Sequence, residues 1–258
     1  QVATPTATQI PFSAQNDGTN PLTGLKVFEP NLLFERPIMV KLANWPQSLR
    51  PFNQIIDADI VFEYYIGYQM NHLLALYYGG DAAAVGPLAP GRLVDARLAR
   101  RYQASLVVTS APPTVEGVFE QTLPDRVFYR GYAPCPGICT ETESQGGNTV
   151  VNTAAMRTFI ESEGISTAIE RLPDFYFDKK IENWDENALR LSYLYADFSV
   201  MDWRYDKTFG GYQLWQDFQQ ADGSYTLQQT FDRDSGQQVI FENVLILLAD
   251  YIEYSPSF

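Results

Sequence analysis

The sequence predicts an α+β fold: a mixed sheet with flanking helices in the N-terminal part, followed by an antiparallel β-meander. Residues 20–186 alternate between strand-like and helix-like segments, whereas residues 187–258 contain strand-like segments separated by glycine-rich turns. Aromatic residues make up 14% of the chain, which favours sheets because flat side chains pack well on a pleated surface. A length of 258 residues is enough to bury a substantial core.

Residues 1–19 are expected to form a flexible tether ahead of the folded part. They are rich in Thr, Pro, Ala and Gln and carry a single charge, at Asp17. Such a segment cannot bury enough apolar surface to offset the entropy lost on ordering. A Thr/Pro-rich tether is typical of the spacer that follows the lipidated cysteine of bacterial lipoproteins. We therefore infer lipid anchoring, although that cysteine does not stand in this segment.

The N-terminal part, residues 20–186, is expected to contain strands and helices in alternation. Apolar runs bounded by turn residues predict strands over residues 37–42, 59–66, 71–78 and 105–109, and helices are expected over residues 91–103, 114–121 and 153–164. Thr114 and Asn152 are expected to cap the second and third helices, because their side-chain oxygens can accept hydrogen bonds from free backbone amides.

The C-terminal part, residues 187–258, is expected to be an antiparallel meander that packs with the N-terminal part. Strand patterns cover residues 190–196, 199–205, 212–218, 224–231 and 239–253. Turn signals such as Gly210–Gly211 and Asp222–Gly223 separate them.

Cys135 and Cys139 enclose Pro136 and Gly137, a turn-forming pair that can bring the two cysteines to disulfide distance. In an oxidising compartment this pair is expected to be bonded. The alternative is half of a metal site, which would need further soft ligands, yet the chain has no other cysteine and one histidine. The pair therefore predicts a disulfide and an extracytoplasmic location.

Charge and motifs narrow the functional classes. The chain carries 18 basic and 31 acidic residues, a net charge of −13, so a nucleic-acid backbone would be repelled. No apolar run reaches the roughly 18 residues of a membrane-spanning helix. Phosphate-binding glycine loops and a serine nucleophile elbow are absent from the sequence. The one histidine, His72, lies in a strand pattern and is expected to be structural, and neither a cofactor nor a metal is expected.

A group of charged residues surrounds the second expected strand. Asp59 and Glu63 share strand parity, so they face the same way in a regular strand. They can pair with Arg50 or Arg92 in a structural network, line a polar ligand pocket, or perform acid–base chemistry. We take Arg50, Asp59, Glu63 and Arg92 as candidate ligand-binding residues and assign no catalytic residue.

One acidic segment has both a functional and a structural interpretation. Asp232, Asp234, Gly236 and Glu242 partly resemble a calcium loop, but the glycine and the glutamate stand one position too early for an EF-hand. A turn in which aspartates accept hydrogen bonds from their own backbone is the preferred explanation.

Four aromatic residues flank one expected hairpin, and they can stack on sugar rings. Core or cross-strand packing explains them without a ligand. They are Trp203, Tyr205, Tyr212 and Trp215.

Several short segments recur in a recognisable order. They are Asn20–Pro21–Leu22–Thr23–Gly24, Arg36–Pro37–Ile38–Met39–Val40, Arg50–Pro51, Ala58–Asp59–Ile60–Val61–Phe62–Glu63, Val85–Gly86–Pro87 with Arg92, Trp203–Arg204–Tyr205–Asp206, Tyr212, Asp232 to Gly236, and Asn243–Val244. In this order they resemble the YerB-like bacterial lipoprotein family, envelope proteins with no established activity. The resemblance implies an anchored, extracytoplasmic α/β protein and supplies no catalytic residues. The chain departs from the family where the Cys135–Cys139 loop replaces a frequent Pro-His-Asn segment.

The sequence thus predicts an extracytoplasmic, lipid-anchored binding or assembly module without identified catalysis, whose partner is an envelope protein or a glycan. One alternative is a cell-wall-directed hydrolase or transferase that uses carboxylates such as Asp59 and Glu63. Another is a structural subunit of a surface assembly.

Overall fold

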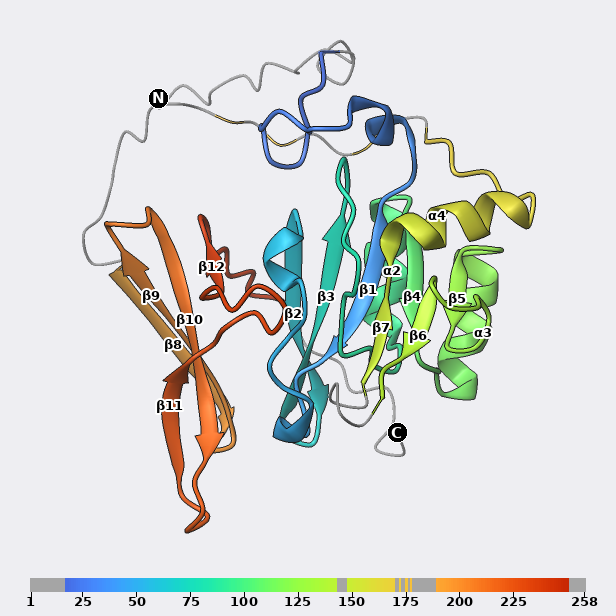
Figure 1. Cartoon of the computed structure of the whole chain (residues 1–258). Helices are drawn as coiled ribbons and strands as arrows, with labels where there is room; N and C mark the ends of the chain where they lie inside the picture. Colours follow the sequence, from blue (N-terminus) through green and yellow to red (C-terminus); the bar gives the residue numbers. More distant parts are fainter. Residues whose placement is uncertain are drawn as a thin grey trace, which may run out of the picture.

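The computed structural model describes residues 17–142, 148–169, 172, 175, 177 and 189–250. This part contains a five-stranded mixed sheet, an antiparallel sheet and a two-stranded sheet. Figure 1 shows the antiparallel sheet beside the mixed sheet, on the side of β2, with α3 beside β5 at the opposite end. The predicted α+β class is confirmed. Within the described part, no helix is long and apolar enough to cross a membrane.

The mixed sheet has the strand order β2-β3-β1-β4-β5. β1 pairs antiparallel with β3 and parallel with β4, and β4 pairs parallel with β5. All residues of β1 are buried, which explains why its sequence is an almost continuous apolar run. The strands are β1 (Ile38–Ala43), β2 (Ile60–Gly67), β3 (Met70–Tyr77), β4 (Ser105–Val108) and β5 (Val127–Tyr129).

The strands that the sequence did not predict are the three-residue strands β5, β6 (Ile138–Thr140) and β7 (Thr149–Val151). β6 and β7 pair with each other to form the two-stranded sheet. Strands of this length carry too little alternation to be recognised from their own sequence.

The α-helices are α2 (Leu93–Arg101), α3 (Pro113–Thr122) and α4 (Thr153–Ser162), and short 3₁₀ helices cover Pro30–Phe34, Gln47–Leu49 and Ile55–Asp57. The cap of α4 is confirmed, because the Asn152 side chain accepts a 2.9 Å hydrogen bond from the Ala155 amide. The predicted cap of α3 is wrong. α3 begins at Pro113, with Pro112 at the cap position. Proline suits the first helical position because its φ is already helical and it has no amide hydrogen that would lack a partner.

The antiparallel sheet contains β8 (Arg190–Ala196), β9 (Ser199–Asp206), β10 (Gly211–Gln219), β11 (Tyr225–Gln229) and β12 (Ile240–Phe241). The last expected strand, over residues 239–253, is wrong over residues 242–250, and residues 251–253 lie outside the described residues. β12 pairs with Tyr212 and Gln213 of β10, and the apolar residues 245–248 are exposed, Leu248 at 96%. No described strand lies beside this run to pair with it.

Apolar side chains bury both faces of the mixed sheet. On one face, Met39 and Leu106 pack with Ala96 of α2 and Phe119 of α3. The other face belongs to a second cluster, in which Val40 and Val107 are joined by residues of α4 and of the antiparallel sheet, including Met156, Trp203 and Leu214. Alternation along β1 and β4 thus places α2 and α3 on one face, and α4 and the antiparallel sheet on the other.

Candidate functional site

The four candidate ligand residues hold different partners, and within the described part no hydrogen bond or ion pair joins two of them. Arg50 donates to the backbone carbonyls of Asn44 (2.9 Å) and Asp217 (2.7 Å) and pairs with the Asp217 carboxylate at 3.3 Å. Asp217 lies in β10, so Arg50 connects the loop after β1 to the antiparallel sheet.

Asp59 fixes the turn before β2. Its carboxylate accepts hydrogen bonds from the Tyr78 amide (2.6 Å) and from the side-chain amide of Asn20 (2.7 Å). Burial raises the pKa of Asp59 to about 7, although both donors oppose the rise. The Asp59 carboxylate therefore serves contacts within the fold.

Glu63 lies on β2, on the face that meets the antiparallel sheet. It accepts hydrogen bonds from the Asn71 side-chain amide (2.6 Å) and from the hydroxyl of Tyr193 in β8. Burial raises the pKa of Glu63 to about 7. Asp59 and Glu63 thus serve separate contacts and do not form a paired acid–base centre.

Arg92 lies beside a buried charged centre that the sequence did not reveal. Lys41 of β1 and Asp95 of α2, both with fully buried side chains, form an ion pair at 3.3 Å. The hydroxyl of Tyr64 bonds to both, and the other Asp95 oxygen accepts a 2.6 Å bond from the Arg92 amide. Burial lowers the pKa of Lys41 to about 8 and raises that of Asp95. The available signal was a lysine within an otherwise apolar strand.

His72 lies near this centre and is buried. Burial, followed by the positive charges of Lys41 and Arg92, holds the pKa of His72 well below its usual range. The imidazole is therefore neutral. Its Nδ1 and the Nε of Arg92 have no hydrogen-bond partner within the described residues.

The predicted disulfide is confirmed between Cys135 and Cys139, whose Cα atoms are 4.8 Å apart. The interpretation of the Asp232 segment as a turn is also confirmed. One Asp232 oxygen accepts hydrogen bonds from the amides of Asp234 and Ser235, at 3.1 Å each.

The aromatic hairpin is packed as expected. Trp203 is buried against Phe241, with ring centroids 5.8 Å apart, and Tyr205 lies opposite Tyr212 at 5.2 Å. The Arg204 guanidinium covers the ring of Trp215 at 3.9 Å.

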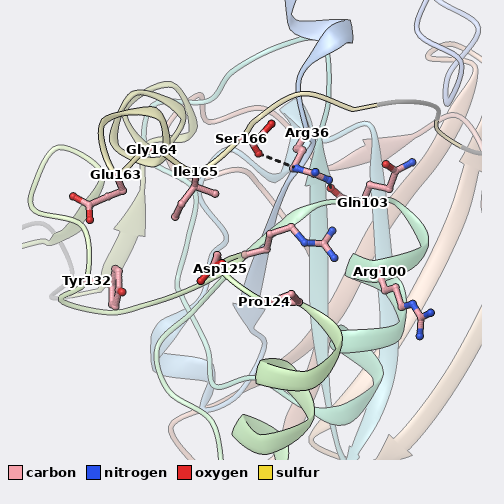
Figure 2. Close-up of a pocket in the computed structure, with 11 residues that line it drawn as sticks. Arg36, Arg100, Gln103, Pro124, Asp125, Tyr132, Glu163, Gly164, Ile165 and Ser166 are labelled. Atoms are coloured by element: carbon pink, nitrogen blue, oxygen red, sulfur yellow. Dashed lines mark hydrogen bonds between the residues drawn. The ribbon is translucent and has the colours of Figure 1, made fainter.

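A cleft of about 740 Å³ lies where β1 begins and where α2, α3 and α4 end. We call it the arginine cleft. Figure 2 shows Tyr132 and Glu163 at one end, Arg100 and Gln103 at the other, and Asp125 between them. Arg36 precedes β1, Arg100 lies in the last turn of α2, and Arg126 precedes β5. The cleft therefore gathers residues that are far apart in the sequence.

Three arginines give the cleft its electrostatic character. Arg36 donates to the carbonyls of Ser166 and Gln103, at 3.1 Å each. Burial lowers the pKa of Arg126, and the positive charges of Arg36 and Arg100 lower it further. The three guanidinium groups therefore repel one another across the cleft. Within the described part, none of them is paired with a carboxylate.

A structural role accounts for part of this charge. Arg100 lies at the C-terminal end of α2, and Arg126 lies 3.5 Å from the Thr122 carbonyl at the end of α3, so both offset helix dipoles. Each guanidinium has five N–H donors, however, and few of them meet a described acceptor. The remaining donors can bind a carboxylate or phosphate group.

The comparisons with known proteins place the chain in a family. Residues 22–166 match the N-terminal domain of a protein of unknown function, DUF3048. The crystal structure of the YerB protein from Bacillus subtilis is similar, with a TM-score of 0.67 and 21% identity, over 86% of this chain and 71% of that one. At this identity the similarity shows the fold. No curated protein matches the chain. The chain belongs to the DUF3048 family, whose YerB-like fold it shares.

Proposed function

We propose that this chain is an extracytoplasmic binding module, lipid-anchored through the tether of residues 1–19, and that an anionic group of its ligand binds in the arginine cleft. The observation that carries the proposal is the set of Arg36, Arg100 and Arg126 in a chain of net charge −13. Three guanidinium groups without carboxylate partners among the described residues form a local positive surface that attracts an anion.

The disulfide supports the extracytoplasmic location, because such bonds persist in oxidising compartments. Binding is favoured over carboxylate-based hydrolysis because Asp59 and Glu63 are occupied by separate structural partners. An envelope protein or a glycan that carries carboxylate or phosphate groups fits the cleft's charge.

The test is a titration with inorganic phosphate at low ionic strength, followed by calorimetry, because screening by salt weakens such contacts. We expect binding by the wild-type chain and weaker binding by Arg100→Gln. Arg97→Gln is the matched control, since Arg97 is an exposed arginine of the same helix that does not line the cleft. Equal losses in both variants, or no binding by the wild type, would contradict the proposal.

The location is tested separately by thiol labelling of the chain recovered from its native cells. Cys135 and Cys139 should resist labelling under denaturing conditions until a reductant is added. Free thiols in freshly isolated protein would argue for a reducing compartment.

A further inference from the structure

We propose that the ligand of the arginine cleft is an anionic saccharide, a sugar ring that carries a phosphate or carboxylate group. The charged group lies on the arginines and the ring lies on Tyr132. This inference rests on the proposed function, because both use the same cleft, and it adds the class of the ligand.

Tyr132 is the ring platform. Its side chain is 60% exposed, yet the ring is held by edge contacts with Phe128 and Phe159, whose centroids lie 6.2 and 6.4 Å away. An aromatic ring fixed in this way can pack against a ligand ring with little further loss of conformational entropy. The face of an aromatic ring is electronegative, so it attracts the weakly positive C–H groups of a sugar ring.

Asp125 and Glu163 supply hydrogen-bond acceptors in the same cleft, and both are exposed. Ionised carboxylates accept hydrogen bonds from hydroxyl groups but repel phosphate. A ligand with several hydroxyl groups matches these acceptors, whereas a bare anion does not.

The charges limit the ligand to few negative groups. Three arginines and two carboxylates line the cleft, so its formal charge is +1. One anionic group neutralises this charge, whereas a polyanion would meet the field of a chain with net charge −13.

The layout and size of the cleft agree with one ligand that contacts both ends. Tyr132 and Glu163 lie at the end opposite Arg100 and Gln103 (Figure 2). A volume of about 740 Å³ is in the range of pockets that hold small organic ligands. A ring at the Tyr132 end thus leaves the arginine end for the charged group.

The experiment compares four titrants by NMR: glucose, inorganic phosphate, glucose 6-phosphate and glucuronate. We expect glucose 6-phosphate or glucuronate to bind about tenfold more tightly than glucose or phosphate, since both ends then contribute. The last two titrants distinguish a phosphate-bearing from a carboxylate-bearing ligand.

Two variants separate the ring from the charge. Tyr132→Ala should weaken the better of the two charged sugars about fivefold and leave phosphate binding unchanged. Tyr132→Phe should retain the affinity, and Tyr68→Ala, at an exposed tyrosine outside the cleft, is the control. Asp125→Asn should strengthen phosphate binding and weaken sugar binding.

If phosphate binds as tightly as both charged sugars, or if Tyr132→Ala changes nothing, the cleft recognises an anion alone. The saccharide inference then fails while the proposed function stands. If none of the titrants binds, both fail.

Discussion

Substitutions of Lys41 and Asp95, the two members of the buried ion pair, should have strongly coupled effects on the free energy of unfolding. Both side chains are fully buried, and their atoms are 3.3 Å apart. In Lys41→Met, Asp95 keeps its hydrogen bonds from Tyr64 and from the Arg92 amide but loses its counter-charge. Removing one partner of a buried pair costs about 3–5 kcal/mol, because an uncompensated charge remains in the interior.

The double variant Lys41→Met/Asp95→Asn removes both charges, and asparagine can still accept from the Arg92 amide. We expect it to lose less stability than the two single variants added together, by about 1–3 kcal/mol. Urea denaturation with unchanged slopes measures these differences. Lys26→Met is the control, since Lys26 and Asp17 form an exposed pair and should show no measurable loss. The reasoning would be refuted if the stability losses of the two single variants added up to that of the double variant. It would also be refuted if Lys41→Met lowered the free energy of unfolding by less than about 1 kcal/mol.

Two further predictions concern stability. Burial raises the pKa of Glu63 to about 7, so the native chain retains a proton that the unfolded chain releases above pH 4.5. The stabilisation from this proton is complete below pH 4.5 and is lost as the pH rises through 7. Glu63→Gln should therefore reduce the pH dependence of urea denaturation between pH 5 and 7.5, where Asp59 still contributes its own share, and an unchanged curve would contradict the raised pKa. Asn152→Ala should cost about 1 kcal/mol, because the Ala155 amide loses its acceptor. Asn152→Asp should restore that stability, and thermal unfolding measures both.

In the mixed sheet, β1, β3 and β4 could be predicted because their buried residues are mostly apolar. β1 is buried at every residue, and such strands read as continuous apolar runs. A continuous apolar run also predicted a strand near the end of the chain, and there the prediction was wrong. Whether residues 244–249 form a strand depends on a neighbouring strand, which the run's own sequence does not contain. Likewise, Thr114 is a good capping residue by type, but Pro113 begins the helix one residue earlier.

The site was less predictable than the fold, because its contacts join distant segments. Arg50 was identified as a functional candidate, yet its partner Asp217 lies 167 residues away. The arginines of the cleft stand at the ends of separate elements and form no motif. Only the register and packing of the mixed sheet bring them together. Residue type could therefore indicate candidate residues, whereas their contact partners could be identified only from the tertiary structure.

The disulfide should influence ligand binding through Tyr132, which precedes Cys135 by three residues in the same loop. Opening a loop this short should cost about 2 kcal/mol of stability, as estimated from its closure entropy. Cys135→Ser/Cys139→Ser should loosen the loop and weaken glucose 6-phosphate binding, while phosphate binding persists on the arginines. The loop has a second support, because the Gly137 carbonyl accepts a 2.9 Å hydrogen bond from the Asn152 amide. If sugar affinity survives in the serine variant, that backbone contact and the ring contacts with Phe128 and Phe159 are sufficient to hold Tyr132. If it falls while phosphate affinity does not, the oxidising compartment and the ligand site are linked through a single loop.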